Sequence, residues 1–195
     1  MSAGKPIATL RSNTGIPAGR LAVWWLLASE IVIFGGLIAA YLMARFAYPQ
    51  FGDFAANTNT WIGAFNTFVL ICSSATVVAG LFAIQNDDRR KFNLWWGLSI
   101  LFGAFFVGVQ VYEYLHLFHL DMTPNQDLFW STFYVMTGFH GAHVIIGVVW
   151  LAAVYVAALR GKYSSKDFVG LELAGLYWHF VDLVWVLLFT LVYLM

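Results

Sequence analysis

The chain alternates between long apolar runs and short polar connections. Five of the runs exceed the roughly 20 residues that a helix needs to cross a bilayer. The connections, 48–59, 86–92, 119–127 and 160–169, leave no room for a soluble domain, and the short alternating segments of a membrane barrel are absent. We therefore predict an all-α membrane protein, one bundle of five transmembrane helices. The predicted spans are 21–47, 60–85, 93–118, 128–159 and 170–195.

Positive charges mark one side of this bundle. Lys and Arg gather before the first span, between spans two and three, and between spans four and five, whereas the other two connections contain neither. Only Arg45 lies at the opposite end of a span. The positive-inside rule then predicts a cytoplasmic N-terminal segment, residues 1–20, and a C-terminus outside, with residues 21–195 as the membrane domain. The absence of a signal-peptide core in the first 20 residues agrees with this. The charges are Lys5, Arg11, Arg20, Arg89, Arg90, Lys91, Arg160, Lys162 and Lys166.

Composition narrows the possible functions. The chain is 61% hydrophobic and 10% charged, against about 25% charged in soluble domains. Its net charge is zero, so nothing indicates a nucleic-acid partner. Cys72 is the only cysteine, which excludes an intrachain disulfide, a CxxCH haem attachment and a thiolate cluster.

Two further patterns predict how the helices sit. Six tryptophans near span ends are expected in interfacial belts. Small residues four apart in span one, Gly35 with Ala39 and Gly36 with Ala40, predict close helix packing, as do the glycines on either side of His140. The six tryptophans are Trp24, Trp25, Trp61, Trp95, Trp96 and Trp130, and the two glycines are Gly138 and Gly141.

Ionisable side chains inside the spans are the main candidates for function, because such groups are expensive in hydrocarbon. At about 1.5 Å of rise per residue, five of them fall near the middle of the bilayer. Residues three apart share a helix face, so we expect a polar contact zone joining spans one, four and five. In that zone Asp182 would accept a hydrogen bond from a histidine. The five are Glu30, His140, His143, His179 and Asp182, while Glu113 and His116 lie nearer the outer surface.

Three interpretations of these residues stay open on chemistry alone. The His-x-x-His spacing is workable for a metal or haem site, which would need further ligands from other spans. A proton or ion path through Glu30, the histidines and Asp182 is the second interpretation, and it would suit a stand-alone proton-coupled transporter. The third is a satisfied hydrogen-bond network that fixes how the helices pack. No proline lies inside a span to break a helix at midplane, which counts against the transporter.

Four sequence blocks resemble one known family. Ser29 and Glu30 open the first block, which runs to residue 40, and Gln110, Glu113 and Tyr114 belong to a Gln-x-x-Glu-Tyr segment. The others are TGFHGAHVIIG at 137–147 and YWHFVDLVW at 177–185. In order and spacing these blocks are similar to subunit III of the haem-copper terminal oxidases, the family of cytochrome c oxidases and quinol oxidases. The blocks extend over four of the five spans, and their combination is specific.

The resemblance implies a fold and a role. The short N-terminus is that of a five-span bacterial form, whose helices form a V-shaped bundle with phospholipids in its cleft. Subunit III holds no haem or copper, since these lie in subunits I and II, where oxygen is reduced to water and protons are pumped. It packs beside subunit I and is implied to support proton uptake and oxygen access. The implied buried polar and lipid-cleft residues are Glu30, Glu113, His116, His140, His143, His179 and Asp182.

The branch of the family is less sharply marked. The Ser-Glu pair of span one favours a cytochrome c oxidase, whereas the ending FTLVYLM at 189–195 is also similar to quinol oxidases. An accessory protein of nitric oxide reductase is a further alternative. We expect a multi-pass protein of the bacterial plasma membrane with oxidase subunits I and II and phospholipids as partners. Membership of a respiratory supercomplex stays open.

Overall fold

The computed structural model describes residues 17–48, 51 and 60–194. Five long helices and a terminal π-helical turn follow one another, and all five helices are long and apolar enough to cross a membrane. This confirms the predicted five-helix membrane fold. The elements are α1 (Ala18–Ala47), α3 (Thr60–Gln85), α4 (Arg89–His119), α5 (Leu128–Leu159), α6 (Val169–Phe189) and η2 (Thr190–Leu194).

The predicted bounds of two spans, 60–85 and 128–159, agree with α3 and α5. Helix α4 begins at Arg89, four residues before the predicted start of span three at residue 93. Asp88 precedes the helix as its N-cap and accepts a hydrogen bond from the Lys91 backbone N–H at 3.0 Å. That bond and the Lys91 ammonium hold the pKa of the Asp88 carboxyl below its ordinary value. The charged residues therefore form the first turn of the helix instead of a loop.

The other span ends differ less. The first helix starts at Ala18, three residues before the predicted span, and α6 starts at Val169. The chain continues from α6 into the π-turn η2 as far as Leu194. Residues 1–16 of the predicted N-terminal segment and Met195 of the predicted last span lie outside the described residues.

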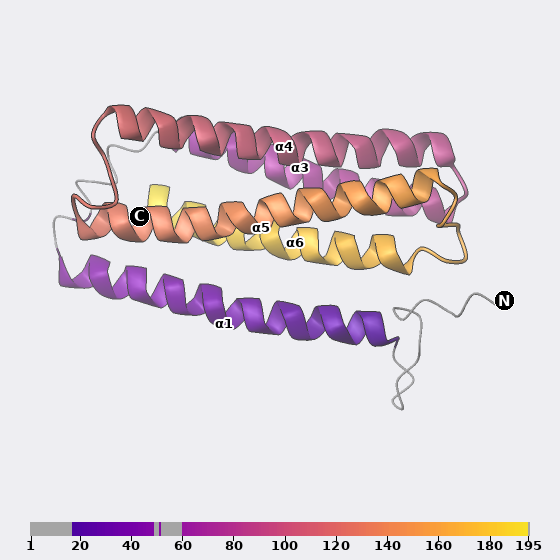
Figure 1. Ribbon diagram of the computed structural model, residues 1–195, viewed down its shortest axis with the longest axis horizontal. Coiled ribbons are helices and arrows are strands. Elements are labelled where there is room, and N and C mark those ends of the chain that lie inside the picture. Colours follow the sequence, from indigo (N-terminus) through magenta and orange to yellow (C-terminus); the bar gives the residue numbers. More distant parts are fainter. Residues whose placement is uncertain (1–16, 49–50, 52–59, 195) are drawn as a thin grey trace.

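The helices surround a central pair, α5 and α6 (Figure 1). On one side α3 and α4 form an antiparallel hairpin, with α3 against α6 and α4 against α5. On the other side α1 packs against α5 and α6. Of the five spans, α6 is the most buried and α1 the least. The two most recognisable sequence blocks thus lie on the two central helices.

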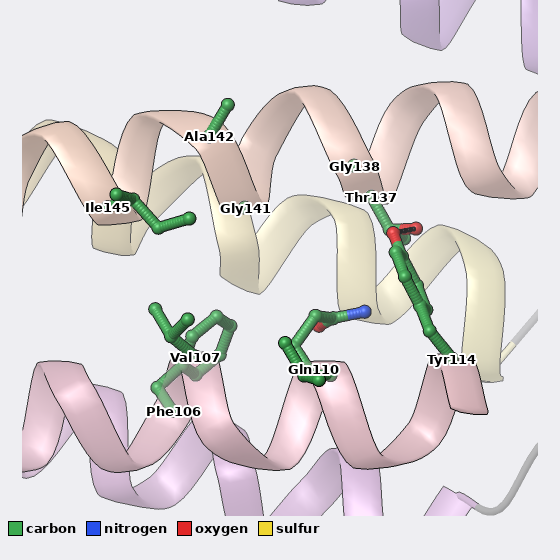
Figure 2. A pocket seen from close by; sticks show the side chains of 10 residues that line it. Phe106, Val107, Gln110, Tyr114, Thr137, Gly138, Gly141, Ala142 and Ile145 are labelled. Atoms are coloured by element: carbon green, nitrogen blue, oxygen red, sulfur yellow. Dashed lines mark hydrogen bonds between the residues drawn. The ribbon is translucent and has the colours of Figure 1, made fainter. Parts of the chain in front are cut away.

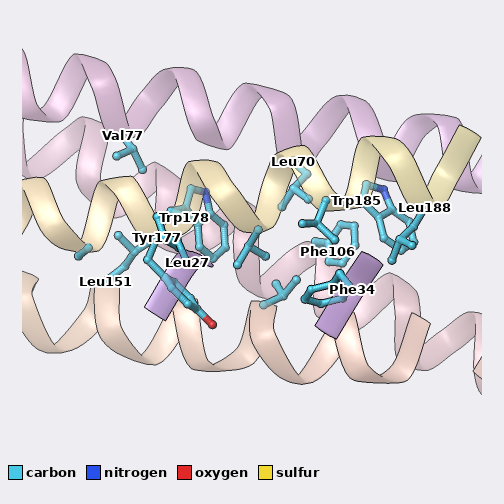
Figure 3. Packing of buried hydrophobic residues seen from close by; sticks show 14 of the residues in the cluster. Leu27, Phe34, Leu70, Val77, Phe106, Leu151, Tyr177, Trp178, Trp185 and Leu188 are labelled. Atoms are coloured by element: carbon cyan, nitrogen blue, oxygen red, sulfur yellow. The ribbon is translucent and has the colours of Figure 1, made fainter. Parts of the chain in front are cut away.

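Aromatic side chains fill the interior (Figure 3). The indole N–H of Trp178 donates to Ser73 Oγ at 2.8 Å, and that of Trp185 donates to Thr67 Oγ1 at 2.9 Å. Buried indoles need such partners, so these bonds fix the register of α6 against α3. Trp96 of α4 and Trp130 of α5 are also buried. These two tryptophans therefore pack inside the protein.

Two glycines make room for the Trp178 ring. A Cβ atom on Gly103 of α4 would lie 2.6 Å from the ring, and one on Gly147 of α5 would lie 2.8 Å from it. The small residues predicted to bring helices together are different ones. A Cβ atom on Gly35 or Gly36 would meet nothing within 4 Å, so these two glycines do not bring α1 close to another described helix of this chain. Close approach occurs where a tryptophan has to fit.

Polar contacts gather the connections at one end of the bundle. The Arg89 guanidinium donates to the Ala158 carbonyl at 3.3 Å and to the Tyr163 carbonyl. Ser165 Oγ donates to an Asp87 carboxylate oxygen at 2.8 Å. The connection before α4 is thus tied to the connection after α5, and the positively charged segments that follow α3 and α5 lie at the same end.

Candidate functional site

Glu30 and His143 form a contact between α1 and α5. Glu30 Oε2 lies 3.1 Å from His143 Nε2, and each side chain is 12% exposed. The chain places Glu30 there because it belongs to the buried stripe of α1, with Val23, Leu27 and Phe34 at helical spacing. The distance is that of an ion pair, but the direction of the ring nitrogen falls short of a well-aligned hydrogen bond.

The second ring nitrogen of His143 determines what the first can do. His143 Nδ1 lies 2.8 Å from the carbonyl of Phe139, one turn earlier on α5. A carbonyl oxygen only accepts, so Nδ1 carries the hydrogen in this bond. Nε2 is then the ring nitrogen that faces Glu30 across the α1–α5 contact.

The His140 side chain is turned further into the bundle than that of His143. Its side chain is fully buried and neither ring nitrogen has a hydrogen-bond partner. The imidazole stacks on Trp185 with ring centroids 5.0 Å apart, and the rings of Phe34 and Phe106 meet it edge-on. Although three residues apart, His140 and His143 therefore have different surroundings and do not act as a pair of ligands.

His179 and Asp182 meet α3 rather than the histidines of α5. His179 Nδ1 is hydrogen-bonded to Ser74 Oγ. Asp182 lies beside the same hydroxyl, and its Oδ1 atom is buried without a partner. The expected bond from a histidine to Asp182 is not found, because Ser74 lies between the two side chains. Ser74 carried no signal in the sequence, since one serine in an apolar span is common.

Glu113 finds its partner at the end of the chain. The hydroxyl of Tyr193, in η2, lies 2.9 Å from both carboxylate oxygens of Glu113 on α4, and both residues are buried. His116, by contrast, is exposed and stacks on Tyr112 of its own helix, with ring planes 7° apart. The structure does not bring His116 to the other predicted site residues.

Polar contacts hold α1 at three levels, although it is the least buried span. One lies near its start, one near its middle and one near its end. They are Arg20 Nη2 with Glu172 Oε2 (2.7 Å), Glu30 with His143 (3.1 Å) and Tyr41 Oη with the Leu191 carbonyl (3.2 Å).

The candidate residues thus form several separate contacts between helices. Among residues 17–48, 51 and 60–194, no three His, Cys, Asp or Glu side chains gather as metal ligands would. The structure therefore provides no observation for the metal-site interpretation, and the absence of a cofactor from this chain stays a prediction. These contacts join α1 to α5 and α6, α3 to α6, and α4 to η2.

Comparison with known proteins defines the family. A sequence model of the cytochrome c oxidase subunit III family matches residues 9–195. Cytochrome c oxidase subunit 3 of Thermostichus vulcanus is 41% identical over 170 residues, 87% of this chain and 83% of the relative. The Bacillus subtilis protein of the same name is 36% identical, over 90% of this chain and 85% of the relative. A probable quinol oxidase subunit 3 of Staphylococcus saprophyticus is 32% identical, over 94% and 92%.

The chain belongs to the cytochrome c oxidase subunit III family. This confirms the resemblance drawn from the four sequence blocks, and with it the prediction of a non-catalytic oxidase subunit that crosses the membrane several times. Relatives named as cytochrome c oxidase and as quinol oxidase subunits both match, so the family alone leaves the electron donor open.

Proposed function

We propose that this chain is subunit III of a cytochrome c oxidase in a bacterial plasma membrane. It packs beside subunit I, which holds the haems and copper of oxygen reduction, in a complex that also contains subunit II. Two relatives named for cytochrome c oxidase, at 41% and 36% identity, are more similar to it than the quinol oxidase relative at 32%. The positive segments at one end of the bundle support a cytoplasmic N-terminus.

The role of the chain in that complex is structural, and the Glu30–His143 contact is the observation that carries it. Both residues belong to family-specific blocks, and they meet at 3.1 Å between the least buried helix and a central one. The contact, together with those at either end of α1, holds this helix against the bundle. A helix held in this way supports proton uptake and oxygen access by keeping its neighbourhood in a fixed shape.

Phospholipid is the second part of the proposal. Between the outer half of α1 and the start of α5 lies a groove of about 250 Å³ with mostly apolar walls. We assign it to the lipid-filled cleft implied for the family, because acyl chains match such walls. The groove is lined by Leu37, Ala40, Leu128, Ser131, Thr132, Val135 and Met136.

The Glu30→Ala variant, expressed in the assembled oxidase, tests the structural role. We expect an unchanged haem content, since no redox group is bound here, and a shorter catalytic lifetime during turnover. Loss of haem from the Glu30→Ala complex would contradict the role. Oxygen consumption driven by reduced cytochrome c, compared with that driven by a quinol, tests the assigned donor.

A further inference from the structure

His140 belongs to one of the two most recognisable sequence blocks, at 137–147, and its two ring nitrogens still need hydrogen bonds. The side chain is 0% exposed, and neither nitrogen has a partner in the described part of the chain. Trp185 stacks on the imidazole, while Phe34 and Phe106 meet it edge-on. A neutral imidazole presents one N–H donor and one acceptor nitrogen, and a buried polar atom without a partner is destabilising. The position therefore calls for a molecule that can donate and accept.

A second buried group with an open hydrogen bond lies on α3. Asn66 is 2% exposed, and its amide nitrogen donates to the Phe106 carbonyl at 3.4 Å. Its Oδ1 atom has no partner among the described residues, so this oxygen can accept a hydrogen bond. Thr67, the next residue, accepts the indole N–H of Trp185 at 2.9 Å. Phe106 and Trp185 therefore connect the surroundings of Asn66 to those of His140.

The residues around this position come from four different helices. They are Asn66 of α3, Phe106 of α4, His140 of α5 and Trp185 of α6. The rings of Phe106 and Trp185 lie beside each other (Figure 3), with centroids 4.8 Å apart. Because α3 and α5 each pack on α4 and α6, they are diagonal partners across the centre of the α3–α6 bundle. Side chains on facing helices commonly build binding sites in the core of such bundles.

The Phe106 side chain contacts His140 and also lines a groove between α4 and α5 (Figure 2). The volume of the groove is about 200 Å³, and Thr137 and Gly141 form part of its opposite wall. A Cβ atom on Gly141 would meet nothing within 4 Å, so this glycine does not bring α5 close to another described helix of this chain. A water takes up about 30 Å³ in the liquid. A small displacement of the Phe106 ring into the groove therefore makes room for one or two waters beside His140.

We propose that water is bound at the centre of the α3–α6 bundle, hydrogen-bonded to the His140 imidazole and to the amide oxygen of Asn66. Water is small enough for a fully enclosed position, and it supplies both the donor and the acceptor that these side chains lack. It links α3 to α5, which are not neighbours in the bundle. The site goes beyond the proposed function, since it does not depend on which electron donor the oxidase uses.

The test uses the whole oxidase complex, exposed to a short X-ray pulse that produces hydroxyl radicals from bound water. Mass spectrometry of peptides then locates the oxidised side chains. We expect oxidation of Trp185, although it is only 1% exposed, because radicals form beside its ring. Trp96 is the matched internal control, since it is 0% exposed and its indole N–H donates to the Leu151 carbonyl at 3.1 Å. It should stay unoxidised.

Two variants locate the water. His140→Leu removes the imidazole and Asn66→Leu removes the amide oxygen, and in each we expect the oxidation of Trp185 to fall to the level of Trp96. His116→Leu makes the same substitution at an exposed histidine of α4, so it should leave the oxidation of Trp185 as in the parent.

Several results would overturn the proposal. One is a parent complex in which Trp185 is oxidised no more than Trp96, a comparison that needs no variant to fold. Another is oxidation of Trp185 that is unchanged in both His140→Leu and Asn66→Leu. A density map of the complex with a metal ion at His140, or with its N–H directed at an aromatic ring and no water beside it, would also exclude the water. The readout involves neither haem content nor the electron donor, so this site and the proposed function can fail separately.

Discussion

The contact between Glu30 and His143 allows a quantitative test of how α1 is held. We consider the single variants Glu30→Ala and His143→Ala and the double variant, each in the assembled oxidase. If the two side chains stabilise the subunit through each other, the second substitution should do less harm when the first is already present. The difference is their coupling free energy.

The structure sets the size of this coupling. Both side chains are largely buried and their nearest polar atoms are 3.1 Å apart, but the contact is imperfectly aligned. Polar side-chain pairs in membrane helices are worth about 0.6 kcal/mol on average and about 1.7 at most. Because both side chains are largely buried, we expect a coupling free energy between these two values, about 1 kcal/mol, or about fivefold in a rate.

The assay is the half-life of subunit III release from the complex at one elevated temperature, followed by size-exclusion chromatography and mass spectrometry. Each single variant should release faster than the parent, and the double variant should be about fivefold slower than the two single effects multiplied together. His116→Ala is the control, because His116 is an exposed histidine that stacks on Tyr112 of its own helix. Its half-life should match the parent. Effects of Glu30→Ala and His143→Ala that simply multiply would refute the reasoning.

Two further substitutions test the packing around the site. Gly103→Ala places a Cβ atom 2.6 Å from a buried indole, so it should destabilise the complex by about 1–3 kcal/mol in thermal melts. Its control is Gly108→Ala, which has open space around the Cβ position and should melt like the parent; equal melting temperatures of the two variants would contradict the prediction. Tyr193→Phe leaves the buried Glu113 carboxyl without its hydroxyl partner and should destabilise the complex by about 1–3 kcal/mol. Its control is Tyr112→Phe, at an exposed tyrosine, which should melt like the parent. An unchanged melting temperature in Tyr193→Phe would contradict the contact between Tyr193 and Glu113.

Hydropathy and length predicted the five spans because both follow directly from bilayer thickness. The start of the helix around the third span was not predictable in the same way. The predicted span begins at residue 93, whereas the N-cap of Asp88 starts helix α4 at Arg89. Capping depends on a local backbone bond that hydropathy does not detect.

The buried face of each helix was predictable, but the edge of that face was not. On α4 the buried residues Gln110, Glu113 and Leu117 follow steps of three and four. His116, also three residues from Glu113, falls just beside this stripe and is exposed. On α5 the same step of three residues leads from His140, which is fully buried, to His143, which contacts Glu30 of α1. A shift of one residue along the helix therefore decides whether a side chain such as His116 lies on the buried face or beside it.

The sequence did not predict which side chains of other helices bond to the candidate residues. Ser74 and Tyr193 are ordinary residues of apolar spans, and only packing brings them to His179 and Glu113. Nor did spacing reveal that Trp96 is enclosed and bonded to a carbonyl of α5, since a tryptophan near a span end has the same sequence signal whether it faces lipid or protein. Such contacts depend on which helices become neighbours.

The most direct test of the central claim is purification through a tag on this chain in mild detergent, followed by a reduced-minus-oxidised optical spectrum and mass spectrometry of the bound proteins. A non-catalytic oxidase subunit should bring with it the haem bands of subunit I, together with subunit II, and oxygen consumption driven by reduced cytochrome c. A colourless preparation of this chain alone, under conditions in which the oxidase stays assembled, would contradict the account.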